Sequence, residues 1–225
     1  MQDGTDGLRR VDPNYKNPTG KISFSKTEII HIAIAITVLS VAFTIMMTRR
    51  FTLIGYDAVG EILTFIGISF VLVICSFLLH EFGHKFVAQR YRAWSEFRMY
   101  PYGLLMALVF SMMGFLFAAP GAVYIRGEID KESYGRISLA GPAVNFVIAA
   151  IAIPITLMLD PGTMERFVFQ MLAWLNAFLG LFNMIPVAPF DGSKIVKWNL
   201  KVYIIAVLIG AAELIIILKF IMELI

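Results

Sequence analysis

The sequence predicts an all-α polytopic membrane protein with about five transmembrane helices and one re-entrant element. Of its 225 residues, 59% are hydrophobic and 16% are charged, whereas about a quarter of an ordinary soluble domain is charged. The apolar residues also gather in runs close to the roughly 20 residues that cross a bilayer as a helix. This composition excludes a disordered chain and a nucleic-acid-binding tail, and it makes the lipid bilayer the expected surroundings.

Six apolar runs follow a polar N-terminal leader, residues 1–26. The leader lacks the short apolar core of a cleavable signal peptide, and residues 27–225 are expected to form a single membrane domain. The sixth run contains Glu213, to which no role is assigned. The six runs cover residues 29–48, 62–79, 99–125, 137–159, 167–190 and 202–225.

The second apolar run ends in LLHEFGHKF, where His80, Glu81 and His84 form the pattern H-E-x-x-H. Residues four apart share one face of a helix, so both imidazoles can reach one metal ion while Glu81 lies beside it. This arrangement suits Zn²⁺ with a carboxylate that takes a proton from bound water. Such polar groups are costly inside a bilayer and usually mark function, which disfavours an ordinary polar helix end.

A catalytic zinc site usually has three protein ligands and a water molecule, so one more ligand is expected. Asp191 follows the fifth run in the segment NMIPVAPFDG, whose two prolines break the helix. Broken backbone at membrane depth is tolerated where it lines a cavity, which makes Asp191 the better candidate. His31, the only other histidine, is the alternative ligand. The alternative interpretation is that Asp191 binds no metal and only forms an Asp-Gly turn at the end of a helix.

Three motifs occur in order on separate apolar runs: HEFGH at 80–84, GPAVN at 141–145 and NMIPVAPFDG at 183–192. Together they resemble the site-2 protease family of intramembrane zinc metalloproteases, in a minimal prokaryotic form. The resemblance implies an endopeptidase with one Zn²⁺ per chain. Its substrate would be another transmembrane protein, cleaved in or near its membrane segment in regulated intramembrane proteolysis.

The resemblance also implies a role for each matching residue. Zinc would lower the pKa of its bound water towards about 7, and the acid/base would carry the proton to the leaving amine. The implied residues are the zinc ligands His80, His84 and Asp191, the catalytic acid/base Glu81, and the substrate-contacting Asn183 and Asn145.

Zinc ligation constrains the topology, because residues 80, 84 and 191 must lie at one membrane depth. The fourth and fifth runs supply two crossings between them, so the third run should dip into the membrane and return. Its ends, FRMYPYG and AVYIRG, have strand-like composition. The corresponding region of the family resembles a membrane-embedded β-hairpin beside the site. An ordinary sixth spanning helix is the alternative.

The distribution of positive charge gives an orientation. With the third run re-entrant, fifteen of the 19 Lys and Arg residues lie on one side. The positive-inside rule assigns that side to the cytosol. The sequence therefore predicts a multi-pass plasma-membrane protein with its N-terminus and active site towards the cytosol, and it fixes no oligomeric state.

A zinc transporter, or a metal-binding membrane protein without protease activity, is the main alternative function. Transport would favour ligands spread along a path, whereas this chain carries one tight cluster. Glu81 discriminates between the two, because a base is needed for hydrolysis and not for binding zinc. Another metalloprotease lineage would need a third ligand outside the N-x₇-D-G element, and a purely structural zinc site would have no open coordination position.

Overall fold

The computed structural model describes residues 21–50, 58–115 and 118–221, so most of the predicted polar leader lies outside the described residues. The described chain is mainly helical, with one two-stranded sheet. The elements are α1 (Lys26–Arg50), α2 (Ala58–Val73), the π-helical turn η1 (Ile74–Leu78), α3 (Leu79–Arg90), β1 (Trp94–Met99), α4 (Pro101–Met112), β2 (Gly121–Arg126), α5 (Lys131–Met158), α6 (Met164–Asn183), α7 (Gly192–Trp198), α8 (Leu200–Ile216) and the π-helical turn η2 (Ile217–Ile221).

Four helical segments in the described residues are long and apolar enough to cross a membrane, as expected of an integral membrane protein. They match the first, second, fourth and sixth apolar runs: Lys26–Thr48, Val59–Arg90, Lys131–Met158 and Leu200–Lys219. The fifth run forms α6, which has 20 residues but carries Arg166, Gln170 and Asn176 and is not among the four. The total of five spans therefore stays a prediction.

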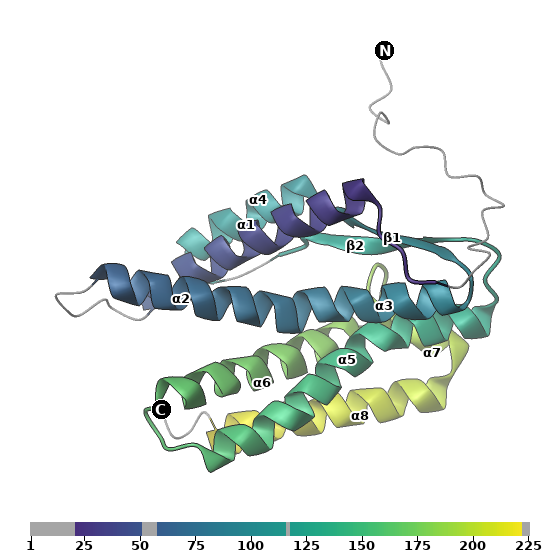
Figure 1. Cartoon of the computed structure of the whole chain (residues 1–225). Helices are drawn as coiled ribbons and strands as arrows, with labels where there is room; N and C mark the ends of the chain where they lie inside the picture. Colours follow the sequence, from purple (N-terminus) through teal and green to yellow (C-terminus); the bar gives the residue numbers. More distant parts are fainter. Residues whose placement is uncertain (1–20, 51–57, 116–117, 222–225) are drawn as a thin grey trace.

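The long helix formed by α2, η1 and α3 separates two layers (Figure 1). On one side α1 and α4 lie next to each other, and on the other side lie α5, α6 and α8. Helices α5 and α6 pack through the small side chains Ala149, Ala152, Ala173 and Ala177, all essentially buried. Small residues let two membrane helices approach closely, which holds the elements around the site in fixed positions.

The third apolar run forms a β-hairpin that encloses a short helix. Strands β1 and β2 are antiparallel, with a register from Trp94 opposite Arg126 to Met99 opposite Gly121. The predicted hairpin is therefore confirmed, but its first strand begins earlier than FRMYPYG suggested. Pro101 explains why the strand already ends at Met99, because proline favours the first turn of a helix and here starts α4.

Helix α4 was not predicted from the sequence. Its 12 residues rise about 18 Å at roughly 1.5 Å each, which is shorter than the roughly 30 Å hydrocarbon core. Because β1 and β2 are antiparallel partners, the chain leaves this region at the end where it entered. This path suits a re-entrant element, whose depth in a bilayer stays a prediction.

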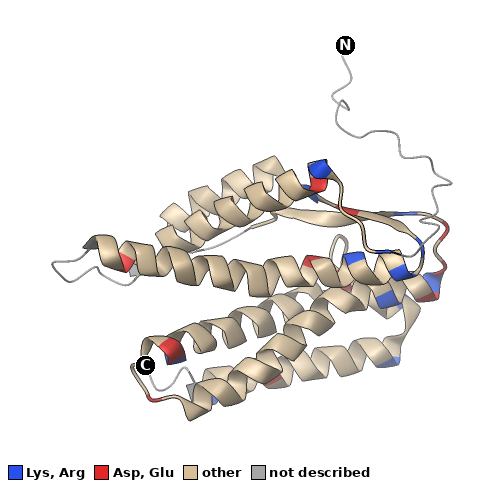
Figure 2. Cartoon of the chain, viewed as in Figure 1, with Lys and Arg blue, Asp and Glu red and all other residues tan. Residues whose placement is uncertain are grey.

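Charged residues gather at the end of the molecule where α3, α5 and α7 approach the hairpin (Figure 2). Large apolar side chains such as Leu63, Val109 and Leu208 are exposed along the helices, as expected for surfaces in contact with lipid. At the charged end Asp130 caps α5 by accepting a 2.7 Å hydrogen bond from the Ser133 N–H. That hydrogen bond holds the pKa of the Asp130 carboxyl below its usual value.

Candidate metal and catalytic site

Helix α3 places the H-E-x-x-H residues as the sequence predicts. His80, Glu81 and His84 are all buried. The Nε2 atoms of His80 and His84 lie 3.0 Å apart, because residues four apart face the same side of the helix. Both imidazoles therefore point to one position, with Glu81 beside it.

Asp191 completes this cluster from the loop between α6 and α7. Its Oδ2 lies 3.0 Å from His84 Nε2 and 3.5 Å from His80 Nε2. A Cβ on Gly192 would overlap the Met184 carbonyl oxygen, so glycine lets the chain fold back against the end of α6. In the described residues, these three side chains are a group whose ligand atoms, all within 4.8 Å of one another, could hold a metal ion.

Both histidines are held through their second ring nitrogen. Nδ1 of His80 lies 2.6 Å from Asn145 Oδ1, and Nδ1 of His84 lies 2.8 Å from the Ile137 carbonyl oxygen. Because both partners can only accept, each Nδ1 carries the proton and each Nε2 presents a lone pair. Two such lone pairs and a carboxylate oxygen repel one another at these distances unless a cation lies between them, so the donor set fits Zn²⁺.

Asn145 is itself fixed by a buried amide network. Its Nδ2 donates to the Ser76 carbonyl oxygen at 2.9 Å and to Asn176 Oδ1 at 2.7 Å. Asn176 in turn donates to Ser76 Oγ at 2.8 Å. Ser76 belongs to the π-helical turn η1, a distortion that is frequent at functional sites. The geometry therefore gives fully buried Asn145 a partner in His80 rather than a place in the cavity lining.

Replacing Asn145 by Ala is expected to lower zinc affinity by about 10- to 100-fold, because it frees the His80 ring to rotate. Asn145→Asp keeps the acceptor oxygen and should lose less. Zinc affinity is measured by competition with a chromophoric chelator in detergent. Thr156→Val is the matched control, since buried Thr156 lies on the same helix and its hydroxyl donates to the Ala152 carbonyl oxygen. Equal affinities for Asn145→Ala and the control would contradict this role.

A cavity of ≈ 180 Å³ opens beside the cluster. Glu81 lines it and accepts a hydrogen bond through Oε2 from the Val123 N–H at 2.9 Å. Asn183 lines it too, and its Nδ2 donates to the Leu179 carbonyl oxygen at 2.9 Å. The lining residues are His80, Glu81, His84, Gly121, Ala122, Val123, Ile125, Tyr134, Ser138, Asn183, Asp191 and Lys194.

Sequence reasoning missed several of these neighbours. The Nζ atom of Lys194 lies 3.1 Å from Asp191 Oδ1. The two residues are three positions apart in the chain, a spacing that could have indicated this contact. Asn176 stands out as an amide within an apolar run, which should have indicated a buried partner. His31 Nδ1 and Glu213 Oε2 have no hydrogen-bond partner among the described residues, and neither residue lines the cavity.

The site and the membrane helices define a class of protein: an integral membrane protein with a zinc-metalloprotease cluster. Residues 162–208 match the sequence profile described as "Peptidase family M50". The chain is 39% identical over 178 residues to a Methanocaldococcus jannaschii protein named "Putative zinc metalloprotease", covering 78% of this chain and 86% of that one. It therefore belongs to peptidase family M50, the site-2 protease family, and its cofactor is Zn²⁺.

Other relatives agree over shorter stretches. A second M. jannaschii protein, named zinc metalloprotease, is 31% identical over 59% of this chain and 34% of its own length. Rip3 of Mycobacterium tuberculosis, also named "Putative zinc metalloprotease", is 30% identical over 64% of this chain and 33% of its own length. This chain thus spans about a third of these two relatives. No solved structure gives a significant match to it.

Proposed function

We propose that this chain is an intramembrane zinc endopeptidase that cleaves other membrane proteins in or near their transmembrane segments. His80, His84 and Asp191 would hold the zinc, and Glu81 would be the general base and acid. The observation that carries the proposal is the position of Glu81. It lines the same cavity as the three ligands without being one of the converging ligand atoms.

Held by His80, His84 and Asp191, Zn²⁺ would supply Lewis acidity that makes water in the cavity more acidic and polarises the scissile carbonyl. Glu81 takes the proton from the attacking water and passes it to the leaving amine. One carboxylate oxygen of Glu81 is held by the Val123 N–H, which leaves the other free for the proton. Asn183 lines the cavity and is the residue proposed to support the developing oxyanion.

Strand β2 is the proposed docking edge for an unwound substrate. The Val123 N–H points away from β1, towards the free edge of β2. Main-chain groups of a strand alternate in direction from one residue to the next, so those of Gly121 and Ile125 also point to this free edge. All three residues line the cavity. A transmembrane helix hides its carbonyls in its own hydrogen bonds, and pairing with β2 would hold a locally extended segment near Glu81.

The proposed orientation is supported by the distribution of charge. We place the cavity towards the cytosolic face of the plasma membrane, because Lys and Arg gather at the end of the molecule that carries the cavity. Cleavage there would release cytosolic parts of substrates in regulated intramembrane proteolysis. The N-terminus would lie on the same side.

The test is cleavage of a panel of single-span membrane proteins by the purified full chain in detergent. We expect cleavage by the zinc-loaded protein, loss of cleavage after treatment with a chelator, and recovery when zinc is added back. The alternative is a zinc transporter, tested by zinc flux into proteoliposomes. Flux without cleavage of any substrate would overturn the protease proposal in favour of transport.

A further inference from the structure

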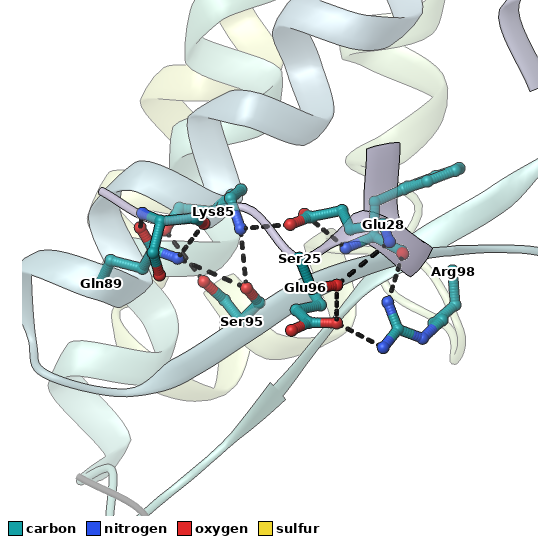
Figure 3. A network of polar contacts seen from close by, with 9 residues as sticks. Ser25, Glu28, Lys85, Gln89, Ser95, Glu96 and Arg98 are labelled. Carbon is teal, nitrogen blue, oxygen red and sulfur yellow. Dashed lines mark hydrogen bonds and ion pairs between the residues drawn. The ribbon is translucent and has the colours of Figure 1, made fainter. Parts of the chain in front are cut away.

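A buried ion pair joins the start of α1 to α3, one helical turn beyond Glu81. Glu28 and Lys85 are both fully buried, and Lys85 Nζ lies 2.8 Å from Glu28 Oε2 (Figure 3). Neither residue lines the cavity. Moving two charges out of water is costly, and their attraction often fails to offset that cost. The pair therefore calls for a role besides stability, and its other contacts indicate one.

Both members of the pair also bind the main chain of β1. Glu28 Oε1 accepts a hydrogen bond from the Phe97 N–H at 2.9 Å. Lys85 Nζ donates to the Ser95 carbonyl oxygen at 2.9 Å, and Ser95 Oγ donates to the Lys85 carbonyl oxygen at 3.2 Å. The edge of β1 that faces away from β2 is thus held between α1 and α3 (Figure 3).

The segment before α1 is tied to the same place. Ser23 exchanges two hydrogen bonds with the Gln89 side chain, at 3.0 and 3.2 Å. Ser25 Oγ donates to Glu96 Oε2 at 2.9 Å and accepts from the Glu28 N–H at 3.1 Å. The start of α1 is therefore fixed against both α3 and the hairpin, so Glu28 can act as a rigid support.

The opposite edge of the hairpin, which is the free edge of β2, contacts Glu81. Phe97 lies directly opposite Val123 in the register. Both N–H groups at this position point away from the partner strand, as in a non-hydrogen-bonded pair of an antiparallel ladder. The Phe97 N–H reaches Glu28, and the Val123 N–H reaches Glu81. One pair of residues in the sheet thus links Glu28 to Glu81, and α3 closes the ring because it carries both Glu81 and Lys85.

We propose that Glu28, held by Lys85, is a positioning residue for Glu81. It fixes the hairpin so that the Val123 N–H keeps the Glu81 carboxylate in place beside the zinc ligands. The kinetic part of this inference rests on the proposed protease function. A displacement of about 1 Å in a catalytic group can cost on the order of 10²-fold in rate, so a loosened hairpin should lower kcat.

Two double variants distinguish the effect of the hydrogen-bond acceptor at position 28 from the effect of the ion pair. Both Glu28→Gln/Lys85→Met and Glu28→Met/Lys85→Met remove the buried charges together, which usually preserves folding. Only the glutamine variant keeps an oxygen for the Phe97 N–H. Since both variants lose the Lys85 contacts equally, we expect the methionine variant to have about 10- to 100-fold lower kcat than the glutamine variant, with KM and zinc content little changed. Equal kcat values in the two variants would overturn the proposal.

Amide hydrogen exchange tests the same link without substrate. In the zinc-bound wild-type chain the Phe97 and Val123 amides should exchange as slowly as amides bonded within the sheet. In Glu28→Met/Lys85→Met the Val123 amide should exchange faster although Glu81 is unchanged, while α5 and α6 are unaffected. Fast exchange at Phe97 in the wild type, or an unaltered Val123 in the variant, would overturn the proposal. If the wild type cleaves nothing, the proposed function fails and exchange alone decides the positioning role.

Discussion

Glu81→Gln is expected to retain zinc and to lose cleavage by about 10²- to 10⁴-fold in kcat, the range for removing a general acid or base. Glutamine has the shape of glutamate, so its amide oxygen can still accept the Val123 N–H that Glu81 Oε2 accepts at 2.9 Å. Its NH₂ group then faces the attacking water and cannot take a proton. The proposed ligand cluster of His80, His84 and Asp191 is untouched.

The measurement pairs zinc content with the rate of cleavage of a single-span substrate, in the same detergent preparation. Glu132→Gln is the matched control, since Glu132 is an exposed residue whose carboxylate pairs with Arg136 on the same helix. It should behave as the wild type, because exposed ion pairs contribute little. Cleavage by Glu81→Gln at the wild-type rate would mean that another group is the base, and loss of zinc would mean that Glu81 acts as a ligand.

The parts of this site that sequence reasoning could reach are those with a local spacing. The H-E-x-x-H pattern predicts two imidazoles on one helix face, and their Nε2 atoms do converge. The broken segment before Asp191 predicts a carboxylate at a cavity, and Asp191 lies in contact with both histidines. In each case the chain geometry within a few residues determines where the side chain can point.

The parts that could not be reached depend on contacts between distant segments. Asn176 meets Ser76 across 100 positions of the chain, and Glu28 meets Lys85 across 57. Each of these polar residues lies within or beside an apolar run, so the sequence indicates that it needs a polar partner. The sequence does not indicate which residue that partner is. The same limit applies to α4, because apolar periodicity does not distinguish a short helix between strands from part of a longer span.

Gly141→Ala is expected to weaken zinc binding strongly while leaving the helix intact. A Cβ on Gly141 would overlap His84 Nε2 and would lie 2.7 Å from His80 Nε2, the two atoms proposed as zinc ligands. The rings cannot easily turn away, because Asn145 and the Ile137 carbonyl hold their Nδ1 atoms. We expect zinc affinity to fall by at least about 10²-fold, the upper end of the loss seen when a ligand's supporting partner is removed.

The change from glycine to alanine itself favours a helix by roughly 1 kcal/mol, so loss of zinc from Gly141→Ala would not reflect loss of α5. Gly67→Ala is the matched control, because a Cβ at helical Gly67 meets nothing within 4 Å. The control should keep its zinc and its activity. Thermal unfolding of both variants without zinc separates folding from metal binding. A Gly141→Ala protein that binds zinc as tightly as the control would show that His80 and His84 do not present Nε2 to the metal.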